Sequence, residues 1–136
     1  MTDSSRSDCE MRVALPATLE AVEQFLMEFR RRGKNLLGSV NCFAAELLVR
    51  EALTNAVVHG GRADPSRQVR CSLRLRGRCL LIVVEDDGEG FDWRTAWRKT
   101  ATFPDCSGRG IEILRKYASR VRFNDRGNVV TMLKRI

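Results

Sequence analysis

The stretch from Gln68 to Val84 constrains the fold more than any other part of the sequence. Polar and apolar residues alternate strictly from Gln68 to Leu75, which is the period-two pattern of a half-buried β-strand. A short turn around Gly77 follows, and an unbroken apolar run then extends from Cys79 to Val84. This pattern predicts a β-hairpin whose second strand is buried on both faces. Other parts of the chain must therefore cover the hairpin.

Two helices are predicted before this hairpin. From Ala17 onwards, apolar residues recur at intervals of three and four, as in an amphipathic helix, and this helix should end near Gly33. The next segment, from Ser39 to His59, is rich in alanine and apolar on several faces. Such a helix is expected to lie packed in the centre of the fold. The apolar positions of the first helix are Leu19, Val22, Phe25, Leu26 and Phe29.

The remaining elements complete an α+β fold. The sequence predicts a first strand from Met11 to Leu15, a helix from Gly110 to Ala118, and a pair of strands from Arg120 to Phe123 and from Val129 to Leu133. The order βααββαββ indicates a two-layer sandwich in which helices lie on one face of a mixed β-sheet. Residues 1–10 are expected to be disordered, and residues 11–136 are expected to form one domain.

The composition is typical of a single soluble domain. The chain has 136 residues, of which 43% are hydrophobic and 30% are charged. It contains no apolar run that approaches the roughly 20 residues needed to span a bilayer. Its first residues are polar and lack the apolar centre of a signal peptide. We therefore expect a cytoplasmic protein without a membrane partner.

The five cysteines have no CxxC spacing, and the chain contains one histidine. These numbers disfavour both a zinc knuckle and a disulfide framework. We interpret the cysteines as small buried side chains in a reducing compartment. Cys106 is the exception, because it falls in a polar stretch of the sequence.

Positive charge is concentrated in the second half of the chain. The formal net charge is +7, and residues 61–136 contain 17 basic and 9 acidic side chains, against 7 and 8 in residues 1–60. One interpretation is a polyanionic partner. The other is a solvated face of the hairpin, formed by Arg70, Arg74, Arg76 and Arg78.

Polar residues lie along the predicted central helix. Glu51 and Asn55 are four residues apart, so they share a helix face, and His59 continues the same line. Polar groups on an apolar helix are costly to bury unless they meet partners. One interpretation is a satisfied internal hydrogen-bond network. In the functional interpretation, Glu51 accepts a proton and Asn55 offers an oxygen ligand to a hard cation such as Mg2+.

Two glycine-containing segments offer sites for a charged ligand. The sequence VVEDDGEGFD ends the buried strand and places Asp87 at a rim of the sheet, where its carboxylate can accept a hydrogen bond from an exocyclic amine. The sequence SGRGIEIL puts Gly108 and Gly110 at the start of a helix, where free amide groups can bind phosphate oxygens. An ordinary loop turn and a helix cap are the alternatives. Neither GxxxxGKS nor GxxxxGKT occurs, so a P-loop is excluded.

In this order, the three motifs resemble those of the GHKL superfamily of ATPases and kinases. They are a helix with ExxxNA, a strand end with DxGxG and, after a loop, a GxG that opens a helix. The resemblance covers the chain from about Arg12 to Arg135 and implies the Bergerat ATPase fold. The small size, the TNAVVHG form of the first motif, the short lid and the terminal LKR strand are most similar to the anti-sigma-factor serine/threonine kinases of bacterial partner-switching systems.

The resemblance also implies roles for individual residues. Glu51 would be the general base, and Asn55 would hold Mg2+. Asp87 would recognise the adenine amino group of ATP, and the segment Trp93–Ser107 would form a lid over the nucleotide. Gly88 and Gly90 would shape the wall of the pocket. Gly108, Arg109 and Gly110 would close over the triphosphate. The implied nucleotide-binding residues are Asn55, Asp87, Gly88, Gly90, Gly108, Arg109 and Gly110.

One position departs from the family pattern. Many members have consecutive threonines just after the glycine of the last hairpin, and one of them helps to hold the aspartate on the adenine side. In this chain Gly127 is followed by Asn128 and Val129, and Thr131 lies further along. The departure concerns nucleotide affinity rather than the fold.

The resemblance implies a serine/threonine protein kinase and anti-sigma factor that regulates transcription. Such a protein transfers the ATP γ-phosphoryl group to a STAS-type anti-anti-sigma protein, with Mg2+ as cofactor, and sequesters a sigma factor. Family members often form homodimers, and the segment Met11–Leu15 with its helix is the expected contact. Two alternatives are an ATP-binding regulatory module without phosphotransfer and a basic domain that binds nucleic acid. The kinase interpretation includes no direct contact with nucleic acid.

Overall fold

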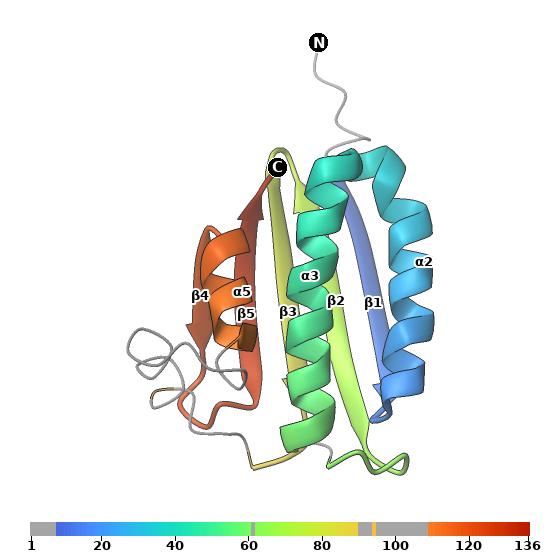
Figure 1. Ribbon diagram of the computed structural model, residues 1–136, viewed down its shortest axis with the longest axis vertical. Coiled ribbons are helices and arrows are strands. Elements are labelled where there is room, and N and C mark those ends of the chain that lie inside the picture. The colour runs from blue at the N-terminus through green and yellow to red at the C-terminus, as the bar shows by residue number, and fades with distance from the viewer. Residues whose placement is uncertain (1–7, 61, 90–93, 95–108) are drawn as a thin grey trace.

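The predicted hairpin is present in the computed structural model, which describes residues 8–60, 62–89, 94 and 109–136. Strands β2 (Gln68–Arg76) and β3 (Cys79–Asp86) pair in antiparallel fashion. Gly77 lies in the turn between them with a φ angle of +58°, a conformation that favours glycine. The hairpin forms the middle of the sheet in Figure 1.

The sheet has five strands in the order β1-β2-β3-β5-β4. The other three strands are β1 (Asp8–Pro16), β4 (Arg120–Phe123) and β5 (Val129–Arg135). All four pairings among the described residues are antiparallel. The prediction of a mixed sheet is therefore wrong. Strands β3 and β4 run in the same direction, but β5 lies between them and is antiparallel to both.

Three helices cover one face of the sheet, as predicted (Figure 1). They are α2 (Leu19–Leu37), α3 (Ser39–Asn55) and α5 (Arg109–Tyr117), and α3 continues into the π-helix η1 (Ala56–Gly60). The α+β sandwich with helices on one side is therefore confirmed. None of the described helices is long and apolar enough to span a bilayer.

Helix α2 begins and ends at identifiable signals. The Thr18 side chain caps its start by accepting a hydrogen bond from the Ala21 amide over 3.1 Å. The helix does not stop near Gly33 as predicted, but continues to Leu37 and ends at Gly38, whose φ angle is +83°. Gly33 is buried against α3, where a Cβ atom would lie 3.1 Å from Cys42 Sγ. Gly33 therefore allows α2 and α3 to pack closely and does not end α2.

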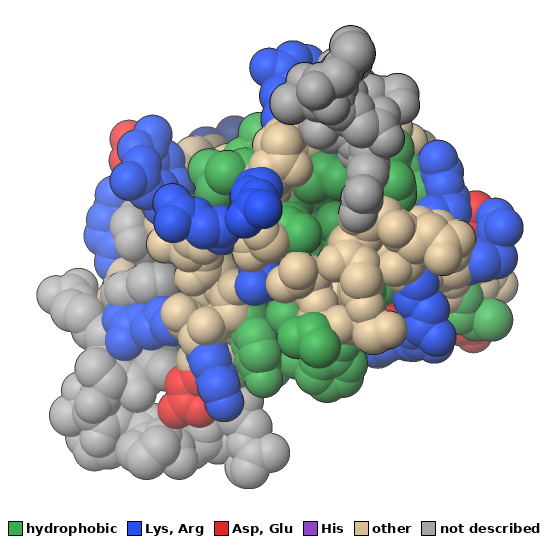
Figure 2. All heavy atoms as spheres, turned by 90° about the horizontal axis from the view of Figure 1, so that it is seen from above, with side chains coloured by type: hydrophobic (Ala, Val, Ile, Leu, Met, Phe, Trp, Pro, Cys, Tyr) green, Lys and Arg blue, Asp and Glu red, His purple; other side chains and the backbone are tan. Residues whose placement is uncertain are grey.

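Basic side chains are prominent on the surface at one end of the sandwich. Figure 2 shows this end along the strands, with Lys and Arg side chains more widespread than Asp and Glu among the described residues. The distribution agrees with the positive net charge of +7.

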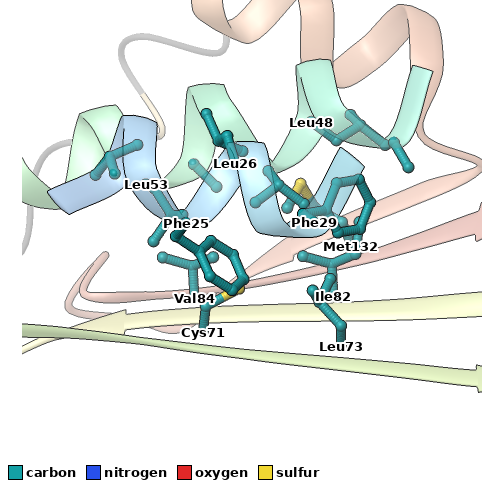
Figure 3. Close-up of a cluster of buried hydrophobic side chains, with 14 of the residues drawn as sticks. Phe25, Leu26, Phe29, Leu48, Leu53, Cys71, Leu73, Ile82, Val84 and Met132 are labelled. Atoms are coloured by element: carbon teal, nitrogen blue, oxygen red, sulfur yellow. The ribbon is translucent and has the colours of Figure 1, made fainter. Parts of the chain in front are cut away.

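The hydrophobic core lies between the helices and the sheet. In Figure 3, Phe25 and Phe29 of α2 point toward side chains that rise from the strands, among them Cys71 and Ile82. Phe25 and Phe29 are 7% and 4% exposed, and Ile82 is fully buried. Burying an apolar side chain of this size contributes about 1.5–3 kcal/mol, so this layer supplies much of the stability.

Three sequence predictions about burial and bounds need correction. Strand β3 is buried on its helix-covered face, but alternate residues are half-buried, because no described helix covers the other face of the sheet. Strand β1 begins at Asp8, within the segment expected to be disordered. Cys42 and Cys71 are buried as predicted, and burial raises the pKa of Cys71 to about 12, whereas Cys79 is exposed. Cys106 lies outside the described residues.

Candidate functional site

A cleft opens where the end of α3 meets the end of β3. One wall comes from α3 and η1, and the other comes from β3, β5, the β4–β5 turn and α5. The enclosed part measures about 20 Å³, enough for one water molecule, and it continues into open solvent. The described residues therefore form the floor of a site rather than a closed pocket. The cleft is lined by Ala52, Asn55, Ala56, His59, Gly60, Val84, Asp86, Leu114, Phe123, Gly127, Asn128 and Val130.

Asp86 is the buried charged side chain of this cleft, with 6% exposure. Its Oδ1 atom accepts a hydrogen bond from the Gly88 amide over 2.7 Å. Burial raises the pKa of the Asp86 carboxyl, and the Gly88 hydrogen bond partly opposes this shift. A carboxylate in such a place is costly unless it meets donors, so the cleft favours a ligand that carries N–H or O–H groups.

Two glycines allow the backbone to pack around this carboxylate. A Cβ atom on Gly60 would lie 2.0 Å from Cγ of Asp86, and a Cβ atom on Gly88 would lie 2.3 Å from the carbonyl oxygen of Gly60. Neither distance is possible for a real side chain. The π-helical turn of η1 ends at Gly60 and so brings the helix backbone directly against the aspartate. Such turns are frequent at functional sites.

The turn between β4 and β5 holds the end of β3 in place. The Asp86 amide donates to the carbonyl oxygen of Asn128 over 3.0 Å, and the Asn128 side-chain amide donates to the Asp86 carbonyl oxygen over 3.2 Å. Asn124 donates in turn to Asn128 Oδ1 over 2.6 Å, and Arg126 donates to the Gly88 carbonyl oxygen over 3.1 Å. Asn128, which departs from the threonine pattern of the family, therefore supports the strand end through its side chain.

Asp87 does not line the cleft, contrary to the sequence expectation. It is exposed and forms an ion pair with Arg70, with 2.9 Å between Arg70 Nη2 and Asp87 Oδ1. The reason is the alternation of β3, in which Leu80, Ile82 and Val84 face the helices and residue 86 follows in the same series. This parity is visible in the sequence, and the motif spacing agrees with it, because Asp86 is the aspartate of DxGxG and Asp87 is its first variable position.

Asn55 and Glu51 occupy different positions relative to the cleft. Asn55 lines it, at the point where α3 becomes π-helical. Glu51 lies one helical turn earlier and is not among the lining residues. Burial raises the pKa of the half-buried Glu51 carboxyl, and the nearby charge of Arg50 opposes the shift. His59, for which the sequence predicts no catalytic role, also lines the cleft.

The other predicted site residues are only partly described. Gly88 lies beside Asp86, and the backbone of Arg109 and Gly110 opens α5 close to the predicted start. Gly90 and Gly108 lie outside the described residues, and so does the predicted lid apart from Arg94.

The donor set of the cleft is compatible with a magnesium nucleotide. Among the described residues, no group of three or more His, Cys, Asp or Glu side chains is placed to hold a metal ion. Mg2+ needs no such cage, because it keeps several waters and binds phosphates with one or two protein oxygens. The Asn55 amide can supply one oxygen, and the Asp86 carboxylate can accept from a base amine.

Two curated proteins similar to this chain are anti-sigma F factors. The anti-sigma F factor of Anoxybacillus flavithermus is 30% identical over 93 residues, which cover 65% of this chain and 64% of the relative. The anti-sigma F factor of Shouchella clausii is 42% identical over 79 residues, covering 55% and 54%. The chain thus spans less than two thirds of the length of these relatives.

The other two comparisons concern a solved structure and a family model. The histidine kinase domain of a blue-light activated histidine kinase from Erythrobacter litoralis is similar with a TM-score of 0.49 and 20% identity, covering 88% of this chain and 64% of that one. Residues 13–134 match the model of the histidine kinase-like ATPase domain. Because this match includes most of the sequence, the chain belongs to the histidine kinase-like ATPase domain family.

Proposed function

We propose that the chain is an ATP-dependent serine/threonine protein kinase that also acts as an anti-sigma factor in the cytoplasm. The observation that carries the proposal is the buried Asp86 carboxylate, which shares a cleft with Asn55 in a chain of this ATPase family. The anti-sigma F factors to which the chain is similar support the regulatory role.

In this proposal Asp86, and not Asp87, accepts the hydrogen bond of the adenine amino group. Its burial makes a hydrogen bond to the charged carboxylate valuable, because little water competes for it. Gly60 and Gly88 leave the space that the carboxylate occupies, and Asn128 fixes the strand end that carries it. Gly90, Gly108, Arg109 and Gly110 remain proposed nucleotide contacts.

Asn55 would hold Mg2+ through its side-chain oxygen. The bound ion would neutralise charge on the phosphates of the nucleotide. Glu51 would act as the general base that takes the proton from the acceptor hydroxyl. Its raised pKa suits this role, since a base works best when its pKa approaches the working pH.

The proposed partners are a STAS-type anti-anti-sigma protein, which receives the phosphoryl group, and a sigma factor, which is sequestered. A homodimer that involves β1 and α2 is proposed as well. β1 is an edge strand, so its outer side can pair with another strand without disturbing the sheet.

A second candidate is an ATP-binding regulatory module that transfers no phosphate. In this candidate Glu51, one helical turn before the cleft-lining Asn55, accepts no proton and has a structural role. The two candidates share the nucleotide site and differ in the transfer step.

Calorimetric titration with ATP and ADP, with and without Mg2+, tests the shared site. Asp86→Asn should abolish binding, and Asn55→Ala should abolish its dependence on Mg2+. Asp87→Asn is the matched control, since it changes the neighbouring and exposed carboxylate in the same way. Normal binding by Asp86→Asn together with lost binding by Asp87→Asn would reverse the assignment.

Labelled ATP tests the transfer step. The wild type should transfer the γ-phosphoryl group to the purified anti-anti-sigma protein, and Glu51→Gln should bind ATP but transfer little. Equal rates for the two proteins would remove Glu51 as the base. Binding without any label on the substrate would select the regulatory module.

A further inference from the structure

The face of the sheet opposite the helices carries an ordered pattern of side chains. We call it the open face. Its residues are the alternate positions of each strand, which the period-two geometry points away from the helices. They are Glu10, Arg12, Ala14, Pro16, Gln68, Arg70, Ser72, Arg74, Arg76, Cys79, Leu81, Val83, Glu85, Arg120, Arg122, Val129, Thr131, Leu133 and Arg135.

The strand register aligns these residues in rows that cross the sheet. One row runs from Arg12 through Ser72, Val83 and Thr131 to Arg122. The next row runs from Glu10 through Arg74, Leu81 and Leu133 to Arg120. The middle of the rows holds Val83 beside Thr131 and Leu81 beside Leu133. Arginines lie toward both edges, and Glu10 lies at the β1 edge of the second row. The open face therefore has an apolar centre and a basic rim.

The rim carries an excess of positive charge that its own acids do not balance. Arg70 pairs with Glu85 and Asp87, and Arg12 pairs with Glu10. Arg74 also forms an ion pair with Glu10, with 3.5 Å between Arg74 Nε and Glu10 Oε2, although the buried Nε atom has no hydrogen-bond partner. Within the part of the chain that the structure describes, the rim arginines on β4 and β5 have no acidic partner within 4.0 Å. These are Arg120, Arg122 and Arg135.

A trough crosses one part of the open face. Its lining includes the small side chains Ala14 and Ser72, the aliphatic Val83, and the charged side chains of Arg12 and Arg70. The trough measures about 430 Å³ and is open to solvent. Small residues beside larger ones create a depression that can receive side chains of a partner.

We propose that the open face is a docking surface for another protein, whose contact patch is aliphatic in the middle and rich in Asp and Glu around it. The composition of the face supports a protein partner, since its cations are all arginines, which interfaces favour over lysine. Because the rim of the open face is positively charged, charge complementarity requires a negatively charged rim on the partner. The proposal does not depend on nucleotide binding, because the open face and the cleft use different residues.

Two other occupants fit the face less well. A second copy would bring a face with the same excess of arginine, and like charges across an interface oppose binding. Single-stranded nucleic acid would need stacking side chains, but no aromatic residue lies among the open-face residues. Phosphates would also leave the Leu81 and Leu133 centre uncovered.

Selection from a displayed random-peptide library tests the proposal, because the enriched peptides show which side-chain chemistry the open face binds. We expect enriched peptides that combine Asp or Glu with Leu, Ile or Val. Their synthetic forms should bind Arg120→Glu/Arg122→Glu at least tenfold more weakly than the wild type, and Leu133→Thr several-fold more weakly. Arg32→Glu/Lys34→Glu is the matched control, because it makes the same charge change on exposed residues of α2. It should bind like the wild type.

Four results would overturn the proposal. Enriched peptides without acidic residues, or equal binding by both double variants, would remove the charge argument. Self-association in sedimentation equilibrium that is lost in Arg120→Glu/Arg122→Glu would assign the face to a second copy. Binding of a single-stranded oligonucleotide that is lost in the same variant would assign it to nucleic acid. Peptide binding that persists in Asp86→Asn separates this proposal from the nucleotide site.

Discussion

Replacing Gly60 with alanine tests the contact on which the cleft depends. The added methyl carbon would lie 2.0 Å from Cγ, 2.1 Å from Oδ1 and 2.4 Å from Oδ2 of Asp86. Real Cβ atoms essentially never come within 3.0 Å of such neighbours, so the carboxylate or the end of η1 must move by about 1 Å. The substitution therefore displaces the proposed adenine-binding group without changing it chemically.

The expected cost has two opposing parts. Overpacking of this kind destabilises a protein by about 1–3 kcal/mol. Alanine in place of glycine in a helical segment returns up to about 1 kcal/mol. We expect a net loss of about 1–2 kcal/mol in the free energy of unfolding. ATP affinity should fall by about 10–100-fold, the equivalent of one hydrogen bond to a charged group.

Urea unfolding and calorimetric ATP titration measure the two effects. Gly77→Ala is the matched control, because it strains a positive φ angle but has no atom within 4 Å and lies far from the cleft. It should lose about 1 kcal/mol and bind ATP normally. In an Asp86→Ala background the three clashing atoms are gone, so Gly60→Ala should be neutral or stabilising. Additivity of the two substitutions within about 0.5 kcal/mol would refute the packing argument.

Three further predictions concern stability and the strand end. The pKa of Asp86 is raised by burial, so the folded state binds more protons than the unfolded state just above the usual aspartate pKa, and this group makes stability fall as pH rises through that window. The stability of Asp86→Asn relative to the wild type should therefore increase as pH rises from acidic to neutral. Chemical unfolding at several pH values measures this difference, and a difference that stays constant with pH would contradict the prediction. Asn128→Ala should lose about 1 kcal/mol and bind ATP several-fold more weakly, because the hydrogen bonds with Asp86 and Asn124 disappear; unchanged titrations would count against a supporting role. Phe29→Ala, at a 4% exposed core position, should cost about 3–5 kcal/mol in thermal or urea unfolding, and a loss below about 1 kcal/mol would mean that the α2 packing is wrong.

Much of the fold follows from local patterns. The hairpin at β2 and β3, the helix that begins near Leu19 and the last two strands lie close to their predicted bounds. The predicted end of α2 near Gly33 is wrong, because a glycine can either end a helix or allow close packing of two helices. Gly33 lies against Cys42, and only the position of α3 distinguishes the two roles.

Of the predicted site residues, Asn55 lines the cleft and Asp87 does not. The motif DxGxG predicts a ligand site at the end of β3, and the sequence interpretation gives the ligand-binding role to Asp87, which is exposed. Counting the alternation from Leu80 would have selected Asp86, because burial on one face repeats every second residue. The support from Asn128 could not be read from the sequence, since it depends on a hydrogen bond to a residue 42 positions away.

By itself, the sequence determined the order of helices and strands and the buried sides of β2 and the first helix, because hydrophobic periodicity acts between residues that are close in the chain. Only the tertiary structure decided that β5 enters between β3 and β4, that Gly60 meets Asp86, and that arginines of distant strands share one face. These outcomes depend on pairings between segments far apart in sequence, and a local pattern is compatible with several such pairings.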